Sequence, residues 1–137
     1  MVKRKRQVER CVSLMRIAIL DNDLRFSDQL YQKISMGFAK RDWALNCHIF
    51  SHPQDLLNSN LGTLHAVFLD IDMPQMTGIQ AAQQVREVLP DVGLIFVSSC
   101  ESMVFEAIKT TPLRFIRKAR LEEELEEAVT ALLNRYH

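Results

Sequence analysis

The stretch from residue 66 to residue 78, "AVFLDIDMPQMTG", carries two aspartates directly after a short apolar run. Asp70 ends the run, Asp72 follows two positions later, and Pro74 and Gly78 then interrupt regular structure. Burying a carboxylate is costly unless a partner compensates its charge. We therefore interpret residues 66–71 as a buried strand that delivers Asp70 to partners supplied by the rest of the chain.

Working outward from this stretch, apolar runs alternate with helical patterns along the whole chain. Strands are expected at residues 16–20, 43–50, 66–71, 93–99 and 112–118, and helices at residues 23–40, 52–60, 78–90, 101–110 and 121–136. Strict alternation with nearly continuous apolar strands favours a parallel sheet covered on both faces. The predicted fold class is α/β, a flavodoxin-like doubly wound sheet of five parallel strands in the order 2-1-3-4-5, with helices on both faces.

Composition excludes several classes of function. The chain has 137 residues with 17 Lys plus Arg and 17 Asp plus Glu, so its formal net charge is zero and gives no general attraction to nucleic acid or membrane. No apolar run approaches the roughly 20 residues that cross a bilayer, and no secretory signal is visible. Three cysteines and four histidines show no metal-site spacing. We expect a cytoplasmic protein with free thiols and no membrane contact.

The chain divides into a short basic segment and one domain. Residues 1–14, "MVKRKRQVERCVSL", are basic and without a clear period, and we interpret them as a disordered tail or as residues upstream of the natural start. The alternative is a basic arm that contacts phosphates. Residues 15–137 are the right length for a single packed domain.

Polar residues follow four of the predicted strands, at the edge where a doubly wound sheet places its site. They are Asp21, Asn22 and Asp23 after the first strand, Asp70 and Asp72 after the third, Ser98 and Ser99 after the fourth, and Lys118 after the fifth. Grouped carboxylates favour Mg²⁺, while a hydroxyl and an ammonium can hold phosphate oxygens. This combination predicts phosphoryl transfer to a carboxylate, with Asp70 as the nucleophile.

From Met15 to about Arg135 the chain resembles the receiver domain of a two-component response regulator. The resemblance rests on "ILDND" at 19–23, "LDIDMPQMTG" at 69–78, "VSS" at 97–99 and "FIRKA" at 115–119. A longer stretch, "TPLRFIRKARLEEELEEA" at 111–128, resembles receivers of the LytTR class, whose regulators usually carry a DNA-binding domain after the receiver. No such domain is contained in these 137 residues, which implies a piece of a longer regulator or a stand-alone receiver.

The resemblance implies a role for each matching position. It makes Asp70 the phosphoacceptor, Asp21 a member of the acid pocket that binds Mg²⁺, and the backbone carbonyl of Asp72 a further ligand. It makes Ser98 the switch hydroxyl and Lys118 the lysine that pairs with the phosphoryl group. Phe115 takes the place of the aromatic residue that turns inward when the hydroxyl moves.

Three positions depart from the family pattern. Asn22 stands where a second metal-binding acid is usual, which puts Mg²⁺ affinity in question unless Asp23 or the Asp72 side chain compensates. Ala119 stands where a proline after a cis bond is usual, and a cis bond to a non-proline residue costs roughly 3 kcal/mol, so this loop is expected to differ. Thr77 stands where an acid or amide is frequent, which we interpret as a local turn variation.

The implied partners are a sensor histidine kinase and a second copy of the chain. The expected homodimer face consists of the fourth predicted helix, the fifth strand and the last helix, and DNA would be bound only through the missing domain. One alternative is a pseudo-receiver that acts by binding alone, motivated by Asn22. Another is a haloacid dehalogenase-like phosphatase, because "LDID" fits its Asp-x-Asp motif. That family, however, places the motif on its first strand and has Thr or Val two residues after the second Asp, where this chain has Pro74.

Overall fold

The computed structural model describes residues 13–74 and 76–136, and the predicted basic tail lies mostly outside them. One five-stranded sheet has the order β2-β1-β3-β4-β5, with every neighbouring pair parallel. Its strands are β1 (Ser13–Leu20), β2 (Trp43–Phe50), β3 (Ala66–Leu69), β4 (Gly93–Ser98) and β5 (Arg114–Arg117). This arrangement confirms the predicted flavodoxin-like fold and strand order.

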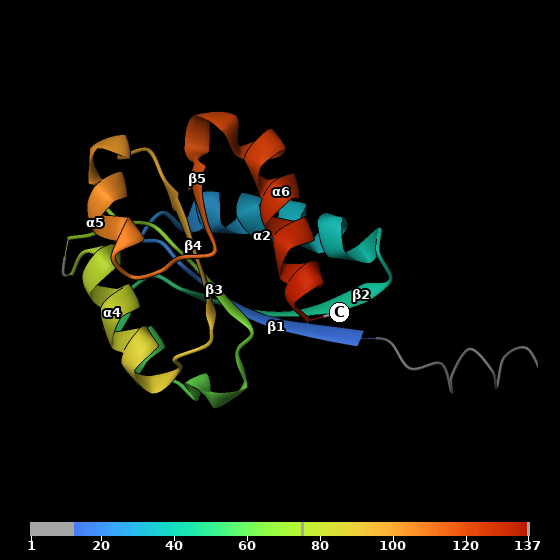
Figure 1. Cartoon of the computed structure of the whole chain (residues 1–137), viewed down its shortest axis with the longest axis horizontal. Coiled ribbons are helices and arrows are strands. Elements are labelled where there is room, and N and C mark those ends of the chain that lie inside the picture. Colours follow the sequence, from blue (N-terminus) through green and yellow to red (C-terminus); the bar gives the residue numbers. More distant parts are fainter. Residues whose placement is uncertain (1–12, 75, 137) are drawn as a thin grey trace, which may run out of the picture.

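Helices connect successive strands and cover both faces of the sheet. They are α2 (Leu24–Ala39), α3 (Pro53–Leu57), α4 (Gly78–Val88), α5 (Val104–Ile108) and α6 (Leu121–Arg135), with short 3₁₀ turns at Leu61–Thr63, Glu101–Met103 and Lys118–Arg120. In Figure 1, α2 and α6 lie on one side of the strands, and α4 and α5 lie on the other. Across the described part of the chain, none of these helices has the length and apolar character needed to span a membrane.

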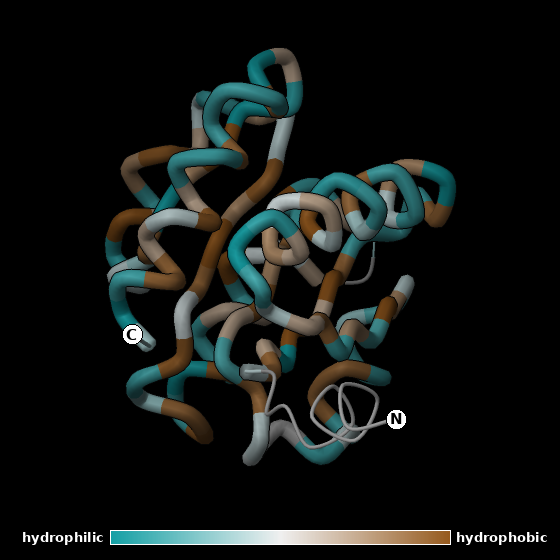
Figure 2. Tube along the Cα trace, turned by 90° about the vertical axis from the view of Figure 1, so that its right-hand side faces the viewer, coloured by the Kyte–Doolittle hydropathy of each residue, from teal (hydrophilic) through white to brown (hydrophobic). Residues whose placement is uncertain are grey.

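Two hydrophobic cores fill the spaces between the sheet and its helices. Side chains of α2 and α6, such as Ile34 and Leu132, pack with Ile17 and Ile19 of β1 on one face. Helices α3, α4 and α5 pack against the alternate strand residues on the other face. Figure 2 shows the matching pattern in the helices, which alternate hydrophilic (teal) and hydrophobic (brown) residues. Both faces are buried because successive strand side chains point in opposite directions.

Some predicted boundaries were wrong. Strand β1 begins at Ser13, which pairs with Trp43, so residues 13 and 14 belong to the sheet and not to the tail. The helix predicted over 101–110 is a 3₁₀ turn followed by the five-residue α5. Neither piece has a side-chain cap at its start, and Ala107 is the buried residue recorded for α5, so little holds a longer helix in place.

Arg86 joins two turns at the amino-terminal edge of the sheet. Its guanidinium donates hydrogen bonds to the carbonyl oxygens of Pro90 (2.8 Å) and Val92 (2.7 Å) in the turn before β4. It also donates to the carbonyl oxygens of Thr110 (3.3 Å) and Thr111 (3.1 Å) in the turn before β5. Thr111 has a left-handed backbone with φ 50°. One side chain thus ties together the loops that lead into two neighbouring strands.

Candidate functional site

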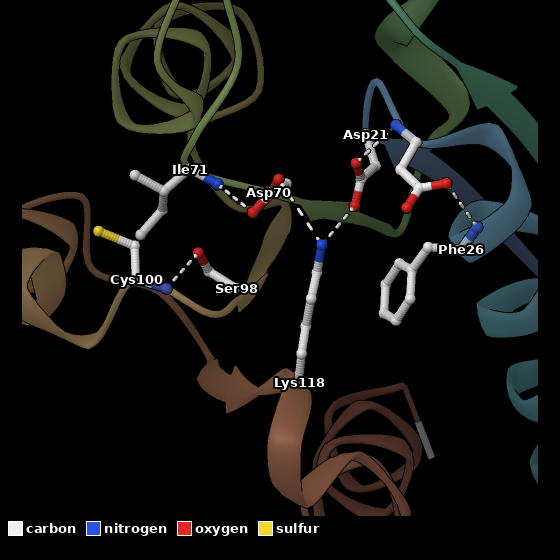
Figure 3. A network of polar contacts seen from close by, with 8 residues as sticks. Asp21, Phe26, Asp70, Ile71, Ser98, Cys100 and Lys118 are labelled. Carbon is white, nitrogen blue, oxygen red and sulfur yellow. Dashed lines mark hydrogen bonds and ion pairs between the residues drawn. The ribbon is translucent and has the colours of Figure 1, made fainter.

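The carboxyl ends of the strands form a cleft of about 300 Å³ lined by Asp70, Asp72, Ser98, Ser99, Cys100 and Lys118. Asp70 lies at the end of β3, Ser98 ends β4, and Lys118 follows β5. Figure 3 shows the end of the Lys118 side chain between Asp70 and Asp21, with Ser98 between Lys118 and Cys100. The structure therefore brings together side chains from four strand ends that are distant in sequence.

Asp70 is the buried acid at the centre of this cleft, with 7% of its surface exposed. Its Oδ1 accepts a hydrogen bond from the Ile71 amide at 2.9 Å, and its Oδ2 lies 3.7 Å from Lys118 Nζ. Burial raises the pKa of the Asp70 carboxyl and the charge of Asp21 raises it further. Lys118 and hydrogen bonds from Ser98 and Ile71 offset part of this rise. Asp70 is thus a poorly solvated carboxylate, and a more basic one than an exposed aspartate.

Lys118 is shared between the two buried acids. Its Nζ lies 3.0 Å from Asp21 Oδ2, closer than the 3.7 Å to Asp70 Oδ2. Asp21 is 3% exposed, and its Oδ1 also accepts a hydrogen bond from the Asp23 amide at 2.9 Å. The ammonium compensates the charge that burial would otherwise leave unpaired. Lys118 is therefore a charged partner of the kind predicted for Asp70 from its position after an apolar run.

The segment after Asp70 is held by α4. Thr77 caps this helix: its hydroxyl accepts from the Gln80 amide (3.2 Å), and the Gln80 side chain accepts from the Thr77 amide (3.0 Å). The Gly78 amide donates to the Ile71 carbonyl at 2.8 Å. The predicted turn variation at Thr77 is thus a capping box, which starts the helix that supports the loop after Asp70.

The loop after Lys118 differs from the family pattern in the way that Ala119 suggests. Every peptide bond among the described residues is trans, and that between Lys118 and Ala119 is included. Residues Lys118–Arg120 form a 3₁₀ turn that leads directly into α6. The lysine is therefore positioned by the start of the last helix.

The remaining predicted metal ligands are exposed. Asn22, Asp23 and Asp72 all lie at the surface, and the Asp23 carboxylate caps α2 by accepting from the Phe26 amide at 3.1 Å. Within residues 13–74 and 76–136, no three His, Cys, Asp or Glu side chains gather closely enough to hold a metal ion. Asp21 and Asp70 still offer two neighbouring carboxylates, and Mg²⁺ sites commonly use one or two.

Phe115 lies away from the acids, on the face of the sheet covered by α4 and α5. It is half-buried, and its ring centroid is 6.0 Å from that of Phe96 on β4. Two further residues at the site do not follow from the sequence pattern. That pattern does not predict contact of Phe26 with Lys118, and it marks Gly78 only as a break in regular structure. The "MTG" stretch was the available signal for the second, because a glycine beside a buried strand end indicates close backbone approach.

The two cysteines within the described residues, Cys47 and Cys100, are free thiols, as expected. Cys47 is half-buried on β2, and burial raises its pKa to about 12. A thiol with so high a pKa is present as the unreactive protonated form at neutral pH.

Comparison with known proteins places this geometry in a family. The model of the response regulator receiver domain matches residues 28–130, a range that contains Asp70, Ser98 and Lys118 and begins after Asp21. The response regulator protein TodT of Pseudomonas putida is 31% identical over 120 residues, covering 85% of this chain and 50% of that protein. The transcriptional regulatory protein YxjL of Bacillus subtilis, described as uncharacterized, is 31% identical over 67 residues, 47% of this chain and 31% of its own length. The chain thus spans at most about half the length of these relatives.

Solved structures agree on the fold. The response regulatory domain of protein mrkE from Klebsiella pneumoniae superposes with a TM-score of 0.76 at 18% identity, covering 89% of this chain and 98% of that one. The response regulator TrrA of Thermotoga maritima, solved with Mg²⁺ and BeF, gives a TM-score of 0.71 at 19% identity, with coverage of 86% and 98%. None of these four proteins is named as a regulator of the LytTR class, so that assignment stays a prediction. From the family match over most of its length and its identity to TodT, the chain belongs to the response regulator receiver domain family.

Proposed function

We propose that this receiver domain is a phosphorylation-controlled switch in which Asp70 accepts a phosphoryl group from a sensor histidine kinase. The observation that carries the proposal is the buried Asp70 carboxylate, which faces a cleft of about 300 Å³ with the Lys118 ammonium 3.7 Å away. Transfer of a phosphoryl group to a side chain requires a nucleophile, room for the phosphoryl oxygens and positive charge near them, and this cleft provides all three.

In the proposed step an Asp70 oxygen attacks the phosphorus atom of the kinase's phosphohistidine. The new phosphorus–oxygen bond forms as the phosphorus–nitrogen bond breaks, and the imidazole leaves and takes up a proton from water. Lys118 and the Ser98 hydroxyl then bind the phosphoryl oxygens from one side of the cleft. In this proposal the domain is the acceptor of the phosphoryl group and does not act on a separate substrate.

The residues present fit Mg²⁺, on the ground that Asp21 and Asp70 form a close pair of buried carboxylates. Asp21, Asp70 and the backbone carbonyl of Asp72 would hold the ion, with Asn22 supplying a neutral amide oxygen in place of an acid. When bound, Mg²⁺ would neutralise charge on the incoming phosphoryl oxygens and reduce the repulsion between the two acids.

The proposed output is a change in the α5, β5 and α6 face that promotes homodimerisation. Support comes from α5, where Phe105 is 81% exposed and Ile108, one turn on, is 54% exposed. Movement of Ser98 toward a phosphoryl group would free space for Phe115 to turn inward beside this face. Light scattering with beryllium fluoride and Mg²⁺ should show a dimer that Phe105→Glu prevents. The matched variant Val88→Glu, at a 61% exposed apolar residue of α4, should leave the dimer intact.

The test of the main proposal is intact mass after incubation with acetyl phosphate, with and without Mg²⁺. The wild type should gain one phosphoryl mass only with the metal, and Asp70→Asn should gain none. Asp91→Asn removes an exposed aspartate in the turn before β4, at the opposite edge of the sheet, and should be labelled like the wild type. A phosphoryl adduct on Asp70→Asn would overturn the assignment of the acceptor.

A second candidate is a pseudo-receiver that keeps the fold and acts by binding alone. The observation in its favour is the acid set, in which Asn22 replaces a carboxylate and the described residues form no three-acid cluster. If the folded protein gains no phosphoryl mass from acetyl phosphate and Mg²⁺, the result would favour the pseudo-receiver. DNA binding through a further domain, transcriptional output and a cytoplasmic location remain predictions. Transcriptional output draws support from YxjL, which is named as a transcriptional regulatory protein.

A further inference from the structure

Phe26 is an aromatic residue in the first turn of α2 that contacts Lys118, one of the residues lining the cleft. Its ring centroid lies 4.2 Å from Lys118 Nζ, with the ammonium over the ring. Figure 3 shows the ring beside the end of the Lys118 side chain, on the side that faces α2. The face of an aromatic ring carries partial negative charge and attracts a cation. Lys118 therefore has three attractive neighbours: two carboxylates and one ring.

The ring occupies a place that neither acid fills. Lys118 has a long flexible side chain that is 21% exposed, so its neighbours, the Phe26 ring among them, cover most of it. The Phe26 ring contacts the ammonium without offering a hydrogen-bond acceptor that would compete with Asp70 or a phosphoryl oxygen. An apolar side chain without a ring would exclude water there but would not attract the charge.

Phe26 is itself held firmly from two directions. Its amide donates to the carboxylate of Asp23, the cap of α2, at 3.1 Å. Its ring is half-buried and packs against the core between the sheet and the layer of α2 and α6. A ring fixed in this way can limit where the ammonium of Lys118 travels.

We propose that Phe26 is a positioning residue for Lys118: its ring holds the ammonium at the acid pair, ready to meet the phosphoryl group on Asp70. This inference rests on the proposed phosphorylation of Asp70. It assigns to the start of α2 a part in phosphoryl transfer that is separate from the acids that precede it.

The test compares Phe26→Leu, Phe26→Met and Phe26→Tyr, the last of which keeps the ring. Labelling by acetyl phosphate and Mg²⁺ should slow by about threefold to tenfold in the Leu and Met variants, in line with a cation–π contact at a partly exposed site. The Tyr variant should restore the rate. The matched control is Tyr31→Leu, which removes another half-buried ring of α2 that packs on the same core. This variant should label at the wild-type rate.

A spectroscopic measurement separates this inference from the proposed function. In the wild type, the proton resonances of the Lys118 ε-methylene group should be displaced by the ring current of Phe26. The Leu and Met variants should lose this displacement, and the Tyr variant should keep it. If the wild type is labelled and every folded Phe26 variant is labelled at the same rate, the role of Phe26 is refuted and the proposed phosphorylation of Asp70 still stands. A wild type without label would overturn the proposed function, and an unshifted methylene resonance would still refute the contact. If Phe26→Leu does not fold, Phe26→Met decides the outcome.

Discussion

Gly78 lies directly against the backbone of Asp70: a Cβ atom added to Gly78 would sit 1.8 Å from the Asp70 carbonyl oxygen. No side chain fits at that distance, so the first residue of α4 must be glycine for the loop after Asp70 to keep its path. Helix α4 therefore sets the position of Asp70 through its backbone.

The first prediction follows from this contact. Gly78→Ala should lower the free energy of unfolding by about 2 kcal/mol or more, because backbone atoms must move apart to relieve the overlap. It should also slow labelling of Asp70. Gly62→Ala is the control, since its Cβ would meet only the Asn60 side chain at 3.6 Å. Urea denaturation of both variants measures the difference, and equal stability would contradict the close packing.

Asp70→Asn should stabilise the protein at pH 7 by on the order of 1 kcal/mol. The pKa of Asp70 is raised by burial and by Asp21, so the folded state disfavours the ionised form. This cost is present above the folded-state pKa and disappears as the pH falls below the ordinary value of 3.8. Lys118 keeps its nearer partner Asp21 in this variant.

Asp21→Asn provides the contrast to that prediction. It removes the carboxylate 3.0 Å from Lys118 and should destabilise the protein at pH 7. Thermal unfolding at pH 7 and pH 3 measures both variants. A less stable Asp70→Asn at pH 7 would show that Asp70 does not carry a burial cost.

Asn22→Asp should tighten Mg²⁺ binding by about tenfold, because it adds a carboxylate beside the two buried acids in a partly solvated position. Isothermal titration calorimetry measures the dissociation constant directly. Asn46→Asp adds the same charge on the exposed side of β2 and should leave the constant unchanged. Equal affinities in the wild type and Asn22→Asp would show that this position does not reach the ion.

His65 should make stability depend on pH below neutrality. Its Nδ1 accepts a hydrogen bond from the Arg16 amide at 2.9 Å, which requires the unprotonated nitrogen. Burial, followed by the charge of Arg16, lowers the pKa of His65 below its ordinary value of 6.5. The stabilisation that unprotonated His65 gives the folded state is thus fully present above pH 6.5. It is lost as the pH falls toward the lowered folded-state pKa.

The measurement for His65 is urea denaturation from pH 8 to pH 5 for the wild type, His65→Asn and His48→Asn. The wild type and His48→Asn should lose stability over this range, and His65→Asn should lose less of it. His48 is an exposed residue of β2, so it controls for the loss of a histidine as such. Parallel curves for all three proteins would refute the role of His65.

Much of the fold could be predicted because the strands are recognisable from their local sequence. The runs "IAIL" and "AVFL" are apolar without interruption, and an acid directly after each run marks the strand end. That the ends of these strands meet follows from the parallel topology alone. The convergence of Asp21, Asp70 and Lys118 could therefore be predicted from the sequence.

The remaining features depend on packing between elements. The distance from Phe26 to Lys118 is set by how the start of α2 lies relative to the 3₁₀ turn after β5, which no local pattern encodes. The overlap that excludes a side chain at Gly78 likewise exists only once α4 has docked. The break between the 3₁₀ turn at Glu101–Met103 and α5 reflects missing caps, a weak signal against a helical composition.

Arg86 has a consequence for the motions of the domain. Because its one guanidinium bonds the carbonyls before β4 and those before β5, neither turn can open without releasing the other. Amide hydrogen exchange in the two turns should then report a single opening event, in the manner of a foldon. We therefore expect the edge of the sheet opposite Asp70 to open locally as one cooperative unit, separately from the cleft edge.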